Sequence, residues 1–150
     1  KVPSLPPDEG RAVDFDTLLA ESDYISVHVP LMPSTEKLFG KAAFAKMKPG
    51  ACIVNTARGG LVDVDALFDA LDSGHLGGAA LDVHPVEPPD LSHPIFQHPH
   101  FIATPHAAFF SEESVEDMQT TVANQVLARL TGQTPEYIVN PDFTKHTPRS

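Results

Sequence analysis

The sequence predicts an α/β fold in which helices flank a parallel sheet. Short segments rich in β-forming residues alternate along the chain with segments whose apolar residues recur at helical spacing. One of the former, Ala51–Asn55, is almost continuously apolar, which is typical of a parallel strand covered on both faces. The chain has 150 residues, 41% of them hydrophobic and 20% charged, which is close to globular averages and excludes a wholly disordered chain.

The first half of the chain predicts two short helices with a strand between them. Asp14 or Asp16 is a suitable N-cap for a helix over Thr17–Glu21. Tyr24–Val29 is short and rich in β-formers, and the proline that follows it ends the strand. Lys41–Met47 is the second helix, and a Pro-Gly turn separates it from the apolar strand already described.

The second half predicts a third helix, two strands and a long last helix. Asp63 or Asp65 can cap the third helix, whose apolar residues recur at helical spacing up to about residue 72. Gly77–Val83 and Phe101–Thr104 are the remaining strands, and a proline-rich loop separates them. The last helix covers Ser111–Leu130, because serine is a good N-cap and apolar residues follow it at spacings of three and four.

Four loops leave the carboxyl ends of the predicted strands, where ligands bind in parallel α/β sheets. Arg58 follows Ala51–Asn55, and its guanidinium is a rigid fork suited to a carboxylate, although a surface arginine is the simpler interpretation of that segment alone. Asp82 lies within an apolar strand, where a carboxylate either faces a ligand or caps a neighbouring loop. Glu87 and His106 follow the last two strands, and each taken singly is explained as well by a solvated or structural role.

Taken together, Arg58, Glu87 and His106 predict a site that interconverts 2-keto and 2-hydroxy acids. Arg58 would hold the substrate carboxylate, and His106 would exchange a proton with the substrate oxygen. Glu87 beside the imidazole would favour its protonated form and determine which ring nitrogen carries the proton. Because no side chain supplies a hydride, the prediction also requires a cofactor.

Four motifs occur in an order, and at spacings, that match a known family. They are VHVPLMPST (27–35), KPGACIVNTARGGLVDVDAL (48–67), GGAALDVHPVEP (77–88) and TPHAAFFSEES (104–114). In these motifs the chain resembles the D-isomer-specific 2-hydroxyacid dehydrogenases. The segment 106–111, with the helix after it, is similar to the branch that includes the C-terminal-binding-protein co-repressors. The resemblance implies a Rossmann-type sheet and NAD as cofactor, which the sequence does not distinguish from NADP.

The resemblance also implies a role for each matching residue. Arg58, Glu87 and His106 correspond to the family's catalytic arginine, glutamate and histidine. Asp82 corresponds to its aspartate that binds the nicotinamide amide. The residues that the resemblance places against the cofactor are His28, Val29, Pro30, Leu31, Thr56, Ala57, Arg58, Asp82, His106 and Ala107.

The family's phosphate-binding glycine motif has no counterpart here, because the 150 residues contain no G-x-G-x-x-G. We therefore expect residues 1–107 to be the second half of a dinucleotide-binding domain whose first β-α-β unit is lacking. Residues 108–150 would be the crossover helix and an extended tail on the substrate-domain side. Without the helix N-terminus that holds the pyrophosphate, we expect this fragment alone to be inactive and to bind NAD weakly or not at all.

Two alternatives to the enzyme hypothesis remain open. An NAD-sensing, co-repressor-like module with little or no turnover would keep the same site residues. A metal site could use His84, His93, His98 and His100, but we interpret this segment as a solvated loop and predict no metal.

Composition and resemblance give three further expectations. A net charge of −10 argues against nucleic-acid and anionic-membrane partners. The single cysteine, Cys52, favours a cytoplasmic protein. The family resemblance implies a homodimer and a small 2-keto or 2-hydroxy acid as substrate.

Overall fold

The structure is a computed structural model that describes residues 10–140 and 142. The chain divides into two compact units, residues 1–108 and 109–150. The second unit contains the helix α4 (Glu112–Leu130). The elements of the first unit are α1 (Phe15–Glu21), β1 (Tyr24–Val27), α2 (Lys41–Lys46), β2 (Cys52–Asn55), the 3-10 helix η1 (Gly59–Leu61), α3 (Val64–Asp72), β3 (Gly78–Leu81), the 3-10 helix η2 (Pro94–Gln97) and β4 (Phe101–Ala103).

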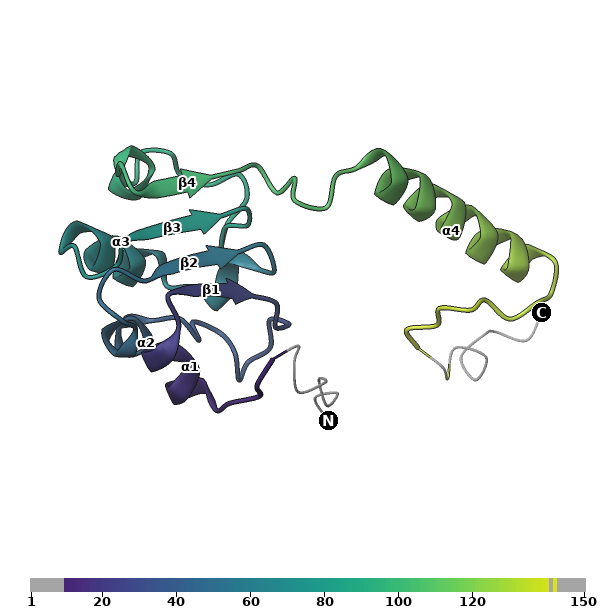
Figure 1. Ribbon diagram of the computed structural model, residues 1–150. Coiled ribbons are helices and arrows are strands. Elements are labelled where there is room, and N and C mark those ends of the chain that lie inside the picture. The colour runs from purple at the N-terminus through teal and green to yellow at the C-terminus, as the bar shows by residue number, and fades with distance from the viewer. Residues whose placement is uncertain (1–9, 141, 143–150) are drawn as a thin grey trace. The chain divides into compact units, whose positions relative to one another are not determined.

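The four strands form one parallel sheet in the order β1-β2-β3-β4 (Figure 1). The register pairs Val27 with Asn55, Asn55 with Leu81, and Leu81 with Ala103. The strands therefore end level with one another, and the loops that follow them leave from one edge. The predicted α/β fold with a parallel sheet is confirmed.

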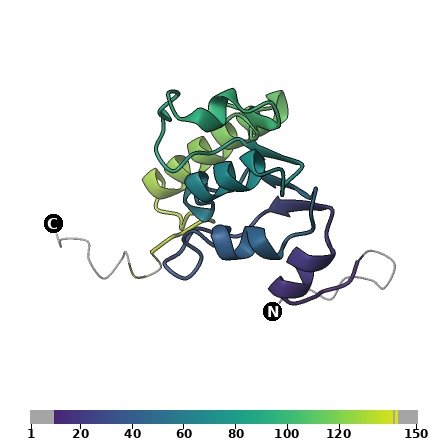
Figure 2. The same ribbon diagram turned by 90° about the vertical axis from the view of Figure 1, so that its left-hand side faces the viewer.

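Within the first unit, the sheet is covered on one face only. Right-handed crossovers between strands that follow the chain order pass over the same face. On that face α1 packs beside α2, and α2 beside α3 (Figure 2). Ile53 and Leu81 are buried there, whereas Val54 and Ile102 on the other face are 36% and 64% exposed. The expectation that Ala51–Asn55 is covered on both faces is therefore wrong for this unit.

Three helices begin at caps that the sequence predicts, and the structure decides between the two candidate caps of α1 and of α3. Asp14 and Asp63 are the N-caps of α1 and α3, and each carboxylate accepts a backbone hydrogen bond from the first turn. Asp16 and Asp65 lie inside those turns, where a negative charge is favourable beside the positive end of the helix dipole. Ser111 begins α4 with a reciprocal capping box.

Among the strands, the predicted boundaries differ from the observed ones by one residue at β2 and β4 and by more at β1 and β3. β1 and β3 end at Val27 and Leu81, two residues earlier than predicted. After β3 the backbone oxygen of Asp82 accepts from the amide of His106, so the chain is bonded to a loop there instead of extending a strand. The helices η1 and η2 lie in segments predicted as loops. In the part of the chain that the structure describes, no helix is long and apolar enough to cross a membrane.

Candidate active site

The loop after β2 is shaped by a buried amide. Asn55, the last residue of β2, is 0% exposed. Its Nδ2 donates to the carbonyl oxygen of Arg58 at 2.9 Å, and its Oδ1 accepts from the backbone N–H of Ala57 at 3.0 Å. The amide thus satisfies one donor and one acceptor of the loop and holds the backbone of Arg58 at the edge of the sheet. Sequence reasoning missed Asn55, although a polar residue ending an apolar strand was an available signal.

The Arg58 loop lies against the loop after β3 because Gly59 has no side chain. A Cβ on Gly59 would lie 2.0 Å from the carbonyl carbon of His84 and 2.4 Å from the nitrogen of Pro85. Only glycine permits this approach of two backbones. Arg58 itself is exposed, and its Nη1 donates to the carbonyl oxygen of Ala57 at 2.6 Å. Most N–H donors of the guanidinium are left to bind a ligand.

Glu87 and His106 form a hydrogen-bonded pair across two loops. Nδ1 of His106 lies 2.8 Å from Oε2 of Glu87, and Oε1 of Glu87 accepts from the backbone N–H of His84 at 2.9 Å. The bond with His106 first, and then the bond with His84, lower the pKa of Glu87 below its ordinary value. The carboxylate is therefore ionised at neutral pH. Because it accepts at Nδ1, that nitrogen carries a proton, which leaves Nε2 as the nitrogen that can exchange one.

His106 has a backbone conformation that favours glycine. Its φ is +55°, which costs a residue with a side chain of order 1–3 kcal/mol. The backbone N–H of His106 donates to the backbone oxygen of Asp82 at 2.8 Å. The surrounding structure therefore holds His106 in place against its local preference.

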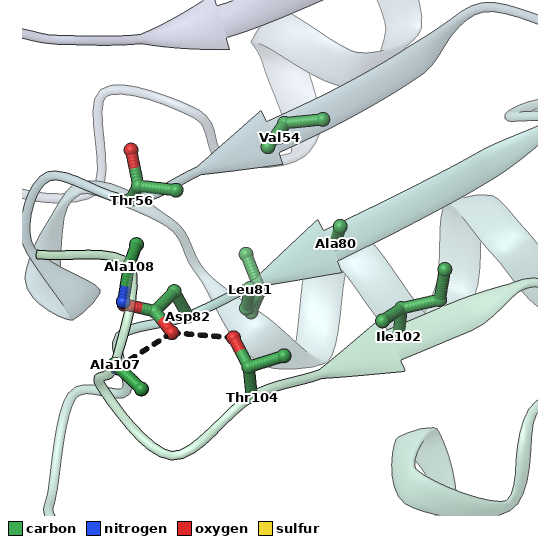
Figure 3. A pocket seen from close by; sticks show the side chains of 9 residues that line it. All are labelled: Val54, Thr56, Ala80, Leu81, Asp82, Ile102, Thr104, Ala107 and Ala108. Atoms are coloured by element: carbon green, nitrogen blue, oxygen red, sulfur yellow. Dashed lines mark hydrogen bonds between the residues drawn. The ribbon is translucent and has the colours of Figure 1, made fainter. Parts of the chain in front are cut away.

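Asp82 is buried directly after β3 and binds the loop after β4 (Figure 3). It is 5% exposed, and its carboxylate accepts from the Thr104 hydroxyl and from the backbone N–H groups of Ala107 at 2.9 Å and Ala108 at 3.0 Å. Burial raises the pKa of Asp82, but these hydrogen bonds outweigh burial and leave the pKa below its ordinary value.

Of the two interpretations left open for Asp82, the structure shows a loop cap. Three bonds occupy the carboxylate, which has about four acceptor sites, so one site is left for a ligand. Sequence reasoning also missed Thr104, the hydroxyl partner of this aspartate. No signal in the local sequence identifies it, because the two residues are far apart along the chain.

Arg58, Glu87 and His106 line one cleft of about 270 Å³, which we name the His106 cleft. The structure thus brings the three predicted catalytic side chains together from the loops after three different strands. The side chains of Glu87 and His106 are 38% and 44% exposed, so a small molecule can reach them. The other residues that line the cleft are Leu31, Gly59, Gly60, Val83, His84 and Pro85.

Two further hollows contain the other residues predicted to contact the cofactor. The first, the His28 cleft, has a volume of about 620 Å³ and is lined by His28, Val29, Pro30, Leu31, Ala57 and Arg58. The second, the Asp82 pocket, has a volume of about 350 Å³ and is lined by Val54, Thr56, Ala80, Leu81, Asp82, Ile102, Thr104, Ala107 and Ala108 (Figure 3). The His28 cleft shares Leu31 and Arg58 with the His106 cleft, so these two hollows adjoin.

The histidine-rich loop after β3 does not form a metal-binding group in the described residues. Nε2 of His93 lies 3.1 Å from Oδ1 of Asp65, and the rings of His98 and His100 have centroids 5.7 Å apart. Within residues 10–140 and 142, no group of three or more His, Cys, Asp or Glu side chains could hold a metal ion. The metal hypothesis gains no support from this geometry.

Known proteins share both the sequence and the fold of this chain. Glyoxylate/hydroxypyruvate reductase B of Pectobacterium carotovorum subsp. carotovorum (strain PC1) is 41% identical over 135 residues, which are 90% of this chain and 42% of that protein. The crystal structure of the TT0316 protein from Thermus thermophilus has a TM-score of 0.85 at 38% identity, over 91% of this chain and 44% of that one. D-lactate dehydrogenase with NAD+ from Lactobacillus jensenii has a TM-score of 0.78 at 36% identity, over 85% and 42% of the two chains.

The similarity covers most of this chain but less than half of each of these relatives. The chain spans about two fifths of the length of each of these three relatives. A family model described as D-isomer specific 2-hydroxyacid dehydrogenase, NAD binding domain, matches residues 4–108, which is most of the chain and nearly all of its first unit. The chain therefore belongs to the D-isomer specific 2-hydroxyacid dehydrogenase family, and its matched residues belong to the NAD binding domain of that family.

Proposed function

We propose that the complete protein is an oxidoreductase that transfers a hydride between NAD(P) and a 2-keto or 2-hydroxy acid of D configuration. One observation carries the proposal: Arg58, Glu87 and His106 line a single cleft at the carboxyl edge of the sheet. Relatives named for glyoxylate, hydroxypyruvate and D-lactate support this class of substrate.

Arg58 holds the substrate in this proposal. Its guanidinium is exposed in the His106 cleft, and its donors beyond the bond to Ala57 can bind the two oxygens of a carboxylate in parallel. Binding the carboxylate there places the neighbouring 2-keto carbon within the same small cleft as the imidazole. In this proposal the acid's carboxylate binds Arg58 and its carbonyl oxygen faces His106.

His106 exchanges the proton. Because Nδ1 is bound to the ionised Glu87, Nε2 donates a proton to the carbonyl oxygen during reduction and accepts it from the hydroxyl during oxidation. Glu87 maintains the orientation of the ring and fixes the proton on Nδ1. It acts through the imidazole and does not contact the substrate.

The chain's residues fit part of a nicotinamide dinucleotide. Val29, Pro30 and Leu31 give the His28 cleft apolar walls, and the remaining acceptor site of Asp82 suits one N–H of a carboxamide. When bound, the cofactor supplies or accepts the hydride that no side chain provides. These residues do not favour NAD over NADP, because the one carboxylate among them, Asp82, is assigned to the carboxamide and not to the ribose 2′-hydroxyl.

The test is turnover by the complete protein. We expect oxidation of NADH with at least one acid from a panel of glyoxylate, hydroxypyruvate and pyruvate. His106→Ala should lower kcat by about 10²–10⁴-fold and change the Kd for NADH much less, because proton transfer is its main role in this proposal. His100→Ala, an exposed histidine outside the three hollows, is the matched control and should retain wild-type turnover.

Two outcomes would contradict the proposal. Wild-type kcat in His106→Ala would exclude the acid/base role. Absence of turnover with every acid, together with NADH-dependent dimerisation, would favour the NAD-sensing, co-repressor-like module. A homodimer and a cytoplasmic location belong to the same proposal, and sizing of the complete protein with and without NADH tests the former.

A further inference from the structure

On both sides of His106, the loop after β4 is hydrogen-bonded to the end of β3 or to Asp82, the residue that follows it. Before it, the backbone N–H of Thr104 donates to the carbonyl oxygen of Leu81 at 3.1 Å, and its hydroxyl donates to the Asp82 carboxylate. After it, the N–H groups of Ala107 and Ala108 donate to the two carboxylate oxygens of Asp82. Residues on both sides of His106 in the chain are thus hydrogen-bonded to Asp82.

The backbone of His106 is bonded to the same aspartate. Its N–H donates to the backbone oxygen of Asp82 at 2.8 Å, and its φ is +55°. A histidine does not keep this conformation unless its neighbours impose it. The neighbours that impose it are the hydroxyl and the two N–H groups, which gather around one buried carboxylate (Figure 3).

The same segment that holds the backbone of His106 also carries its acid partner. Glu87 lies five residues after Asp82, and its Oε1 is bonded to the N–H of His84, between the two. The imidazole and the backbone of His106 therefore both bind segment 82–87, one through Glu87 and the other through Asp82. A change in the loop conformation would move Nδ1 away from Glu87.

We propose that Asp82 and Thr104 are positioning residues, which hold His106 in the left-handed conformation that brings its Nδ1 to Glu87. The importance of this arrangement for turnover rests on the proposed function, whereas the arrangement itself does not. The proposal adds to the cofactor contact implied for Asp82, because one acceptor site of its carboxylate is left for a ligand.

Thr104 gives a cleaner test than Asp82. Its hydroxyl donates to Asp82 and makes no other hydrogen bond in the part of the chain that the structure describes. Thr104→Val keeps the shape of the side chain and removes the hydroxyl, and Thr104→Ser keeps the hydroxyl and removes the methyl group. Both variants are made in the complete protein. Imidazole ¹⁵N resonances, with His106 assigned from the spectrum of His106→Gln, report which ring nitrogen carries the proton in the neutral form.

We expect the wild type and Thr104→Ser to show the Nδ1–H form of His106. Thr104→Val should show a mixture of the two tautomers, because Nδ1 is no longer fixed at Glu87. With a 2-keto acid that the wild type reduces, kcat of Thr104→Val should fall about 10- to 100-fold and the Kd for NADH should change much less. Thr104→Ser should restore most of kcat. A merely structural threonine would lower stability without changing the tautomer.

Several results would overturn the positioning role. One is an unchanged His106 tautomer and kcat in Thr104→Val, and another is Thr104→Ser behaving like Thr104→Val. A higher Kd for NADH with unchanged kcat would make Asp82 and Thr104 cofactor anchors only. If Thr104→Val does not fold, hydrogen exchange of the wild-type Ala107 and Ala108 amides decides, because we expect protection and fast exchange would contradict it.

The two proposals fail separately. If the wild type turns over no 2-keto acid, the oxidoreductase function is wrong. The ¹⁵N tautomer and amide exchange measurements still decide whether Asp82 and Thr104 position His106, since neither needs turnover.

Discussion

Two buried polar side chains, Asn55 and Asp82, shape the two loops that carry Arg58 and His106, and they do so with different chemistry. The amide of Asn55 both donates and accepts, and its partners lie within three residues of it. The carboxylate of Asp82 only accepts, and its partners lie 22 to 26 residues away. A loop that offers one carbonyl and one N–H is closed by an amide, whereas a loop that offers three donors needs a carboxylate. A carboxylate in place of the Asn55 amide, or an amide in place of the Asp82 carboxylate, should therefore destabilise the loop that it binds.

The largest effect is expected for Asn55→Asp. The change replaces the donor to the Arg58 carbonyl with a carboxylate oxygen and places an uncompensated charge at a site that is 0% exposed. We expect the free energy of unfolding of the complete protein to fall by about 3–5 kcal/mol, measured by urea denaturation. Asn124→Asp makes the same substitution on an exposed position of α4 and should change stability by less than about 0.5 kcal/mol. Equal stability of the two variants would show that the Asn55 amide does not close its loop.

A smaller effect is expected for Asp82→Asn. An amide in that place turns one acceptor oxygen into a donor, which then faces a hydroxyl or an N–H donor of the loop. We expect a loss of about 1–3 kcal/mol in the free energy of unfolding, since one buried donor loses its partner. Asp117→Asn on the exposed surface of α4 is the matched control. A stability within experimental error of the wild type would mean that the charge of Asp82 is not needed for the loop.

The smallest effect is expected from pH. Hydrogen bonds lower the pKa of both Asp82 and Glu87, so their contributions to stability are complete above the ordinary carboxyl pKa of about 4 and are lost as pH falls through the lower folded values. The stability difference between the wild type and Asp82→Asn should therefore be constant from pH 7 to 5 and should shrink below about pH 4. Urea denaturation at each pH measures it, and a difference that grows on acidification would contradict the assigned direction.

The strand-and-loop plan was predictable, because its signals are local. Alternating apolar segments predicted the parallel sheet. Asp14 or Asp16, Asp63 or Asp65, and Ser111 predicted three helix starts, since a cap binds backbone within its own first turn. Arg58 and His106 could also be placed directly after strands, because the apolar segments before them are local signals. The coverage of the sheet was not predictable from β2 alone, because an apolar strand does not show on which face its crossovers pass.

The amino-acid sequence by itself determined which residues follow the strands, and so which side chains could meet at the carboxyl edge. Folding decided that Asp82 binds Thr104 and that His106 meets Glu87 with a positive φ, and it decided that Gly59 touches the backbone of His84. The physical reason is distance along the chain. A hydrogen bond between residues about twenty positions apart depends on strand order and register, and these follow from the packing of the whole sheet instead of the residues at either end of the bond.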